Sequence, residues 1–162
     1  MATRSAIGYI NIDGSVTGTY CHWDGYPEHN GAILTQSYTD PHKIRGLIAL
    51  GEISSFDDEI GEQHPFSKFE TDMSEEEYIQ AKANYTTFYH RDRGEDWSRV
   101  QPTTHTDVKA FIEHYDPCGC EYYYIWNGKE WLVNNYNEVD LYGFPIMERV
   151  EDVLEHRKEL DI

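Results

Sequence analysis

The dipeptide Asn127-Gly128 separates two runs rich in aromatic and β-branched residues, and it constrains the fold more than any other feature. Asn-Gly is the pair best suited to the positive φ angles of a tight hairpin turn. We therefore expect strands over residues 121–126 and 129–135, joined by a two-residue turn. In that register three cross-strand pairs form: Tyr124 with Trp131 and Tyr122 with Val133 on one face, and Tyr123 with Leu132 on the other.

A second hairpin is predicted near the N-terminus, where Asp13-Gly14 separates residues 6–12 from residues 15–23. Asp-Gly also suits a tight turn between strands. A two-residue turn would place four side chains on one face of this hairpin: Ile7, Tyr9, Val16 and Tyr20. The second strand would carry Cys21, His22 and Trp23 to its far end.

The rest of the chain contains residues typical of helix starts and ends. Asp40-Pro41 combines an N-cap residue with a proline at the first helical position, and Gly51 is a natural stop. Ser74 and Glu77 have the spacing of a capping box. We expect helices over residues 27–38, 41–50, 74–83, 106–115 and 147–160, a strand over 84–90 and a surface loop over 57–72.

These elements predict a single acidic α+β domain over residues 1–162. Its sheet should be mostly antiparallel with about five strands, two hairpins plus one strand, packed with about five helices. The chain of 162 residues is 39% hydrophobic and 14% aromatic. That composition is too apolar for a disordered acidic chain, and the length is sufficient to bury a core.

Charge limits the partners of this chain. Thirty acidic residues against 13 basic ones give a formal net charge of −17. Such a field repels nucleic acid and anionic membranes, so we expect no direct binding to either. It favours a partner protein with a basic surface, and in the extreme it imitates the phosphate row of a nucleic acid. The alternative is that the acidic surface only keeps the protein dispersed.

The cysteines and the apolar segments indicate a compartment. Cys21, Cys118 and Cys120 are too few for a disulfide framework. Residues 1–7 lack the apolar core of a signal peptide, and no apolar run reaches membrane-spanning length. We therefore expect a cytoplasmic protein.

Residues 20–31, Tyr-Cys-His-Trp-Asp-Gly-Tyr-Pro-Glu-His-Asn-Gly, form the main candidate site. They hold two histidines, a thiol, two carboxylates and three aromatic rings. No amphipathic helix or strand needs that mixture, so we expect a strand end, a tight loop and the start of a helix. The alternative is purely architectural: Gly25 takes the turn, Pro27 starts the helix, and Trp23 and Tyr26 pin the loop to the core.

Two His-x-Asp pairs, His22-Trp23-Asp24 and His90-Arg91-Asp92, are each predicted at the end of a strand. Residues two apart on a strand face the same side, so each pair would aim an imidazole and a carboxylate together. Two such pairs on neighbouring strands would suit a metal centre or a general acid–base pair. The pattern is common by chance, which favours the structural alternative.

A further set of metal-ligand types is His114, Cys118 and Cys120, with Cys21 and His22 available from the first hairpin. Tetrahedral zinc sites need four such ligands, but Cys-x-Cys is tighter than the usual spacing and lacks a second paired half. We favour the alternative, a turn set by Gly119 in which the thiols pack as small apolar groups. No metal and no cofactor is assigned.

Three arginines, Arg91, Arg93 and Arg99, gather around Gly94 in an otherwise acidic chain. They could bind the phosphate or carboxylate of a small anionic ligand, or simply be neutralised by the acidic residues between them. The predicted ligand-binding residues are Tyr20, His22, Trp23, Asp24, Tyr26, His29, Asn30, His90, Arg91 and Arg93. No catalytic residue is assigned.

Four stretches carry a family resemblance: residues 1–7 (Met-Ala-Thr-Arg-Ser-Ala-Ile), 20–31, 47–55 (Leu-Ile-Ala-Leu-Gly-Glu-Ile-Ser-Ser) and 89–95 (Tyr-His-Arg-Asp-Arg-Gly-Glu). In them the chain resembles a family of small proteins of bacteriophages and prophage-bearing bacteria. The resemblance implies an origin on a mobile element, and small acidic phage proteins often bind and disable a host protein. It implies no particular activity or catalytic residue.

Three functions compete. The first is a phage-type accessory protein that binds a host protein, such as a defence or nucleic-acid-handling enzyme, through its acidic surface. The second is a binder that sequesters a nucleotide or another small ligand near residues 20–31 and the Arg91–Arg93 turn. The third is a metal-dependent hydrolase that uses His22, Asp24, His90 and Asp92. We favour the first, because no catalytic signature accompanies the charge.

Overall fold

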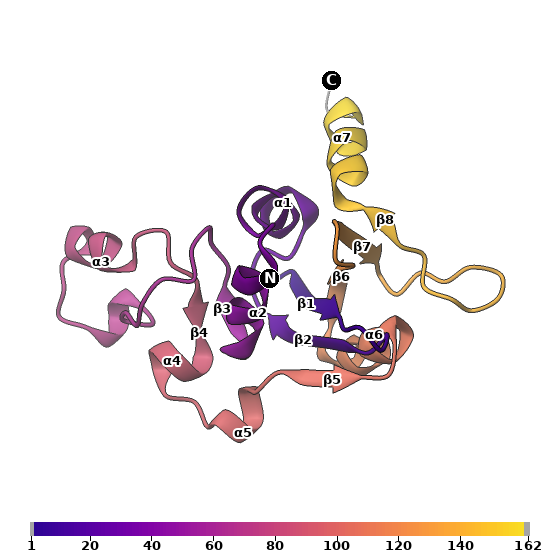
Figure 1. Cartoon of the computed structure of the whole chain (residues 1–162). Helices are drawn as coiled ribbons and strands as arrows, with labels where there is room; N and C mark the ends of the chain where they lie inside the picture. The colour runs from indigo at the N-terminus through magenta and orange to yellow at the C-terminus, as the bar shows by residue number, and fades with distance from the viewer. Residues whose placement is uncertain (1, 161–162) are drawn as a thin grey trace.

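A computed structural model describes residues 2–160, which form an α+β fold around one mixed sheet (Figure 1). The α+β class is as expected, but a mostly antiparallel sheet of about five strands with about five helices is wrong. Residues 2–160 contain an eight-stranded mixed sheet and seven α-helices. The strands are β1 (Arg4–Ile10), β2 (Val16–Cys21), β3 (Ile53–Ser55), β4 (Thr87–Phe88), β5 (Thr103–His105), β6 (Cys120–Trp126), β7 (Trp131–Asn135) and β8 (Glu148–Arg149). The helices are α1 (Ala32–Ser37), α2 (Pro41–Ala49), α3 (Glu75–Lys82), α4 (Tyr89–Arg93), α5 (Trp97–Val100), α6 (Val108–Tyr115) and α7 (Val150–Leu160).

The sheet joins the two expected hairpins through a pairing that the sequence does not reveal. The strand order is β4-β3-β2-β1-β6-β7-β8, and β1 pairs in parallel with β6. The outer edge of β2 is shared by two short strands, because β5 pairs with Val16–Gly18 and β3 pairs with Cys21. The sheet therefore splits along this edge between the two.

Each face of the sheet buries its own apolar cluster. Helices α1, α2 and α7 cover one face, where Ile7 and Tyr124 pack against side chains from all three helices. Helix α6 covers the other face, where Phe111 and Ile112 pack against Ala6. This second cluster is the smaller of the two.

The first hairpin forms with a longer turn than expected. Val16 pairs with Ile10, and Asp13 Oδ1 accepts hydrogen bonds from the backbone N–H and the hydroxyl of Ser15. This register differs by one residue from the prediction, and a one-residue slip moves a strand's side chains to the opposite face. Ile7 and Tyr9 therefore face one cluster while Val16 and Tyr20 face the other, so the predicted shared face is wrong.

The second hairpin is also present, with a register shifted by two residues. Trp126 pairs with Trp131, because Asn127 Oδ1 accepts from the backbone N–H groups of Lys129 and Glu130 and so extends the turn. A shift of two keeps the faces and changes the partners. The observed pairs are Tyr122 with Asn135, Tyr123 with Asn134 and Tyr124 with Val133, in place of the pairs that we expected.

The helix signals at Asp40 and Ser74 are confirmed. Asp40 caps α2 by accepting from the N–H of His42, and Ser74 and Glu77 form the expected capping box on α3. The segment 27–38 divides into a π-helical turn, Pro27–Gly31, followed by α1. Within the predicted helix 106–115, Val108–Tyr115 form α6, and a 3-10 turn, Asp116–Cys118, follows it.

The predicted strand over 84–90 is mostly wrong. Only Thr87–Phe88 is extended, and α4 begins at Tyr89. The side chain of Asp92 causes the change of direction, because its Oδ2 accepts from the N–H of Phe88 at 2.7 Å. The predicted helix over 147–160 starts later, at Val150, because Glu148 and Arg149 pair with β7 as β8. Strand β5 and helix α5 were not predicted.

Candidate functional site

The stretch 20–31 divides into a buried half and an accessible half. Asn30 is fully buried, and its Nδ2 donates to Ser5 Oγ at 3.2 Å and to Cys21 Sγ at 3.4 Å. His29 Nδ1 lies 2.9 Å from Asn30 Oδ1. The carbonyl of Gly25 accepts from the hydroxyl of Tyr124 at 2.6 Å. This half of the predicted site therefore fixes the loop to the sheet.

The accessible half contains Tyr20, His22, Trp23, Asp24 and Tyr26. The hydroxyl of Tyr20 lies 2.8 Å from His22 Nδ1, and the indole of Trp23 packs edge-on against the imidazole. Burial lowers the pKa of His22 and raises the pKa of Tyr20, so a neutral imidazole pairs with a protonated phenol near pH 7. Asp24 takes a φ of 56° at the turn.

The residues 90–93 do not form the second half of a catalytic pair, the less favoured of the two interpretations of the His-x-Asp motifs. Arg91 and Asp92 lie on α4, where Arg91 donates to Asp92 and to the carbonyls of Ile60, Gly61 and Thr86. The side chain of Asp92 is fully buried and also accepts from the N–H of His64. Both side chains are occupied in holding the fold together.

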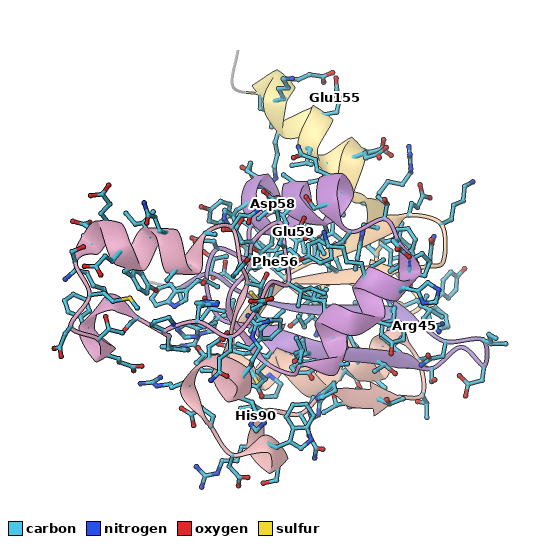
Figure 2. All side chains as sticks on the ribbon, turned by 60° about the vertical axis from the view of Figure 1, so that its left-hand side comes forward. Arg45, Phe56, Asp58, Glu59, His90 and Glu155 are labelled. Carbon is cyan, nitrogen blue, oxygen red and sulfur yellow. The ribbon has the colours of Figure 1, made fainter. Side chains whose placement is uncertain are left out.

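His90 and Arg93 point away from this network. His90 lies at the surface, where its Nδ1 is 2.8 Å from the carbonyl oxygen of Glu95 and its ring packs against Trp97 (Figure 2). Arg93 lies 3.6 Å from a Glu70 oxygen and stacks over Phe66. The Arg91–Arg93 turn therefore does not offer the free arginine forks expected for an anionic ligand.

The cysteines do not converge on a metal site either. Cys21 packs in the cluster under α2, Cys120 packs in the cluster under α6, and Cys118 is exposed. Among residues 2–160, no group of three or more His, Cys, Asp or Glu side chains is arranged to hold a metal ion.

A cavity of about 260 Å³, which we call the sheet-split cavity, opens where β3 and β5 separate along the edge of β2. Tyr20 forms part of its wall, so the cavity adjoins the Tyr20–His22 pair. Arg99 lies at its rim, and Glu52 contributes a carboxylate. The remaining lining residues are Ser98, Gln101, Thr103, His114, Tyr115 and Cys118.

Burial governs the titratable groups of this cavity. It raises the pKa of the Glu52 carboxyl, and it raises the pKa of the Cys118 thiol, which the charge of Glu52 raises further. A thiol with a raised pKa is a poor nucleophile. The cavity is therefore better suited to binding than to covalent catalysis through Cys118.

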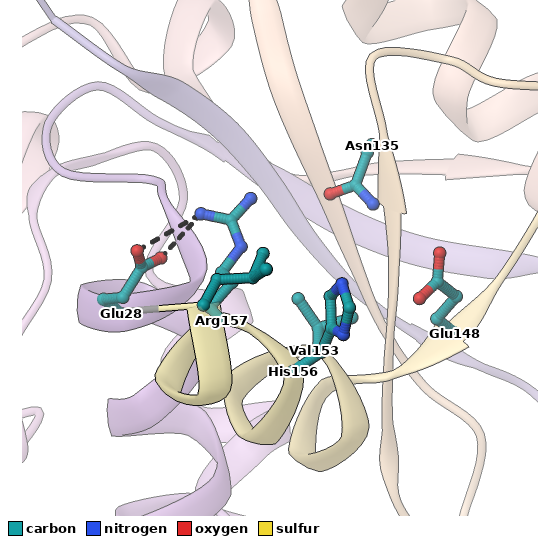
Figure 3. A pocket seen from close by; sticks show the side chains of 7 residues that line it. Glu28, Asn135, Glu148, Val153, His156 and Arg157 are labelled. Atoms are coloured by element: carbon teal, nitrogen blue, oxygen red, sulfur yellow. Dashed lines mark hydrogen bonds and ion pairs between the residues drawn. The ribbon is translucent and has the colours of Figure 1, made fainter. Parts of the chain in front are cut away.

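A larger cavity of about 500 Å³ lies between α7, β7 and the π-helical turn (Figure 3). One wall is an ion pair, in which Arg157 Nη1 lies 2.8 Å from Glu28 Oε1. Arg157 also donates to the hydroxyl of Tyr122 at 3.3 Å. The ion pair with Glu28 ties α7 to the stretch 20–31, so Arg157 has a structural partner.

The most conspicuous surface feature is the projecting loop, residues 136–146, which connects β7 to β8 and extends away from the sheet (Figure 1). It carries six exposed large apolar side chains: Tyr136 (60% exposed), Val139 (49%), Leu141 (99%), Tyr142 (85%), Phe144 (62%) and Ile146 (39%). Apolar side chains gathered in this number mark interaction surfaces in soluble proteins.

The projecting loop has its own hydrogen bonds. Asp140 closes its tip, because its Oδ1 accepts from the N–H groups of Tyr142 and Phe144 at 2.8 and 3.0 Å. The buried side chain of Asn134 closes its base by donating to the carbonyls of Glu138 and Ile146, both at 2.9 Å. The apolar side chains are thus displayed on a defined backbone.

Sequence reasoning assigned nothing to residues 136–146. The signal was present: Val139–Ile146 contains five large apolar residues and a single charge, Asp140. It lacks the alternation of a strand and the 3.6-residue period of a helix, and Gly143 and Pro145 indicate a turn. An apolar run without a regular period is a candidate for an exposed binding loop.

Comparisons with known proteins add no relative. No protein-family model matches the chain, and no curated protein or solved structure is significantly similar to it. The resemblance to phage and prophage proteins therefore stays a prediction. No helix within residues 2–160 is long and apolar enough to cross a membrane.

Proposed function

We propose that this chain is a protein-binding module that docks on a basic partner protein through the projecting loop. The observation that carries the proposal is the display of six large apolar side chains on one hydrogen-bonded loop. Aromatic residues and their neighbours in such clusters supply most of the affinity of protein interfaces, since burying each one stabilises a complex by about 1.5–3 kcal/mol.

Charge supports a basic partner. Glu138 and Asp140 are the charged residues of the projecting loop, and the chain as a whole carries a formal net charge of −17. An apolar centre with an acidic rim is complementary to an apolar patch flanked by lysine and arginine. Together with the sequence resemblance, this supports a phage-type accessory protein that occupies a host protein in the cytoplasm, such as a defence or nucleic-acid-handling enzyme.

The test compares partner binding by a triple variant of the projecting loop and by a double variant that serves as the control. The loop variant replaces Leu141, Tyr142 and Phe144 with serine, and the control variant replaces the exposed Ile12 and Phe69 with serine. Tagged wild-type protein should retain a host protein that the control variant also retains. The loop variant should lose at least about a hundredfold in affinity for it.

A salt series separates the electrostatic contribution. Binding of the retained host protein should weaken as the ionic strength rises, because opposite surface charges attract each other less under screening. Equal retention by the loop variant would show that the partner binds elsewhere on the molecule. Binding that is indifferent to salt would contradict the basic partner.

A further inference from the structure

We propose that the sheet-split cavity binds a small zwitterion, with its protonated amine on Glu52 and its anionic group on Arg99. This inference concerns a different surface from the projecting loop and stands independently of the proposed function. Its starting point is the contrast between the half-buried Glu52 and Asp92, whose side chain is fully buried.

The carboxylates of Glu52 and Asp92 differ in the hydrogen-bond donors around them. Asp92 accepts from two backbone N–H groups and from Arg91. No donor within residues 2–160 hydrogen-bonds the half-buried carboxylate of Glu52, and burial raises its pKa. Placing a charge away from water without a donor is unfavourable. A ligand that donates from a cationic group would remove this penalty.

The backbone holds Glu52 rigidly at the split in the sheet. Its N–H donates to the carbonyl of Val100 at 2.8 Å, and its carbonyl accepts from the N–H of Tyr89 at 3.2 Å. These contacts join the segment before β3 to α5 and α4. The backbone from which the carboxylate extends is therefore fixed at the split, so a ligand need not order this segment when it binds.

The tyrosines of the cavity have their hydroxyl groups already occupied. The Tyr20 hydroxyl is paired with His22, and the Tyr115 hydroxyl lies 2.7 Å from Thr103 Oγ1. Their rings are left to form the walls. Aromatic rings attract an ammonium group to their faces, and a carboxylate in the same cavity adds a counter-charge.

Arg99 supplies the second anchor. It is exposed at the rim, and it makes no ion pair or side-chain hydrogen bond within the described part of the chain. Arg91, Arg93, Arg149 and Arg157, in contrast, all have carboxylate partners. A free guanidinium binds carboxylate or phosphate through two parallel hydrogen bonds. A ligand with an amine but no anionic group would leave the Arg99 guanidinium without a partner.

Cavity size limits the ligand. At about 260 Å³ the cavity lies below the range of about 300–1,000 Å³ that is usual for drug-sized ligands. A molecule of about ten non-hydrogen atoms or fewer fits, which admits free amino acids and ω-amino acids but not a nucleotide. Affinity for so few atoms should be about millimolar.

The test uses ω-amino acids of increasing length as probes, from glycine to 6-aminohexanoate, followed by NMR of the uniformly ¹⁵N-labelled protein. At least one length should give saturable shifts of the backbone amides of Tyr20, Glu52 and Thr103. Butylamine should bind more weakly than 4-aminobutanoate, and butanoate should not bind. The absence of saturable shifts at these amides for every probe would overturn the proposal.

Four variants then assign the anchors. Glu52→Gln should lower the affinity for the best ω-amino acid and for butylamine at least about tenfold. Arg99→Gln should lower the affinity for the amino acid and leave the affinity for butylamine unchanged. Glu155→Gln and Arg45→Gln, outside this cavity, should change neither (Figure 2). Unchanged binding in folded Glu52→Gln protein would overturn the ammonium anchor, and unchanged amino-acid binding in Arg99→Gln would overturn the zwitterion.

Discussion

Replacing Asp92 with alanine tests whether the motif His90-Arg91-Asp92 is structural. The side chain of Asp92 is fully buried and accepts from the N–H of Phe88 at 2.7 Å, the N–H of His64 at 3.2 Å and Arg91 Nε at 3.0 Å. Alanine leaves two backbone donors without an acceptor and a mostly buried guanidinium without its counter-ion. Removing one partner of a buried pair costs about 3–5 kcal/mol.

For a chain of this length, each kcal/mol shifts the thermal midpoint by about 2–4 °C. The Asp92→Ala protein should therefore melt about 6–20 °C below the wild type by circular dichroism. Asp92→Asn keeps one acceptor oxygen, so its thermal midpoint should lie between those of the wild type and Asp92→Ala. Asp72→Ala, at an exposed position, should change the free energy of unfolding by about 0.5 kcal/mol or less. A loss below about 1 kcal/mol for Asp92→Ala would refute the structural role.

Three further predictions follow from buried groups. Burial raises the pKa of Cys21 to about 12 and also raises that of Cys120, so a thiol reagent should label Cys118 alone in the native protein and all three cysteines after denaturation; fast native labelling of a second thiol would contradict the burial. Because burial raises the pKa of Glu52, its ionised form disfavours folding, so Glu52→Gln should raise the free energy of unfolding at pH 7. That gain should shrink as the pH falls through the folded-state pKa and vanish below about pH 4, as urea titrations would measure. Asn134→Ala should leave the sheet folded but increase amide hydrogen exchange in the projecting loop, and unchanged exchange there would show that its base is held by other contacts.

Local signals in the sequence predicted the elements well where one or two residues decide the structure. Asp40 caps α2, Ser74 and Glu77 cap α3, and both hairpins form at the expected places. The registers were wrong because Asp13 and Asn127 accept hydrogen bonds from residues beyond the two-residue turn. Turn dipeptides indicate where a chain reverses, but side-chain hydrogen bonds set the length of the loop.

Contacts between distant segments were not predictable in the same way. The parallel pairing of β1 with β6 joins the two hairpins, and nothing in either strand specifies that neighbour. The same holds for Asp92, which ends a short strand by accepting from residues 64 and 88. The predicted strand over 84–90 failed for this reason, and the pairing of His90 with Asp92 failed with it.

The sequence singled out one part of the surface around the sheet-split cavity and not the rest. The Tyr20–His22 pair beside the sheet-split cavity came from the chemical mixture of residues 20–31. Glu52 was not among the predicted site residues, and Arg99 was grouped with Arg91 and Arg93, which have carboxylate partners. Their place at one cavity depends on β3 and β5 sharing an edge of β2, which is a tertiary arrangement.

The most direct test of the proposed function is photo-crosslinking in host cells from a benzoylphenylalanine placed at Tyr142, compared with one placed at Phe69. Both side chains are highly exposed, but only Tyr142 lies in the projecting loop. We predict one discrete crosslinked host protein with a basic surface from position 142, and a crosslinking yield that falls when salt is added to a host-cell lysate. Crosslinks only to a second copy of this chain, or equal diffuse yields from both positions, would contradict the account.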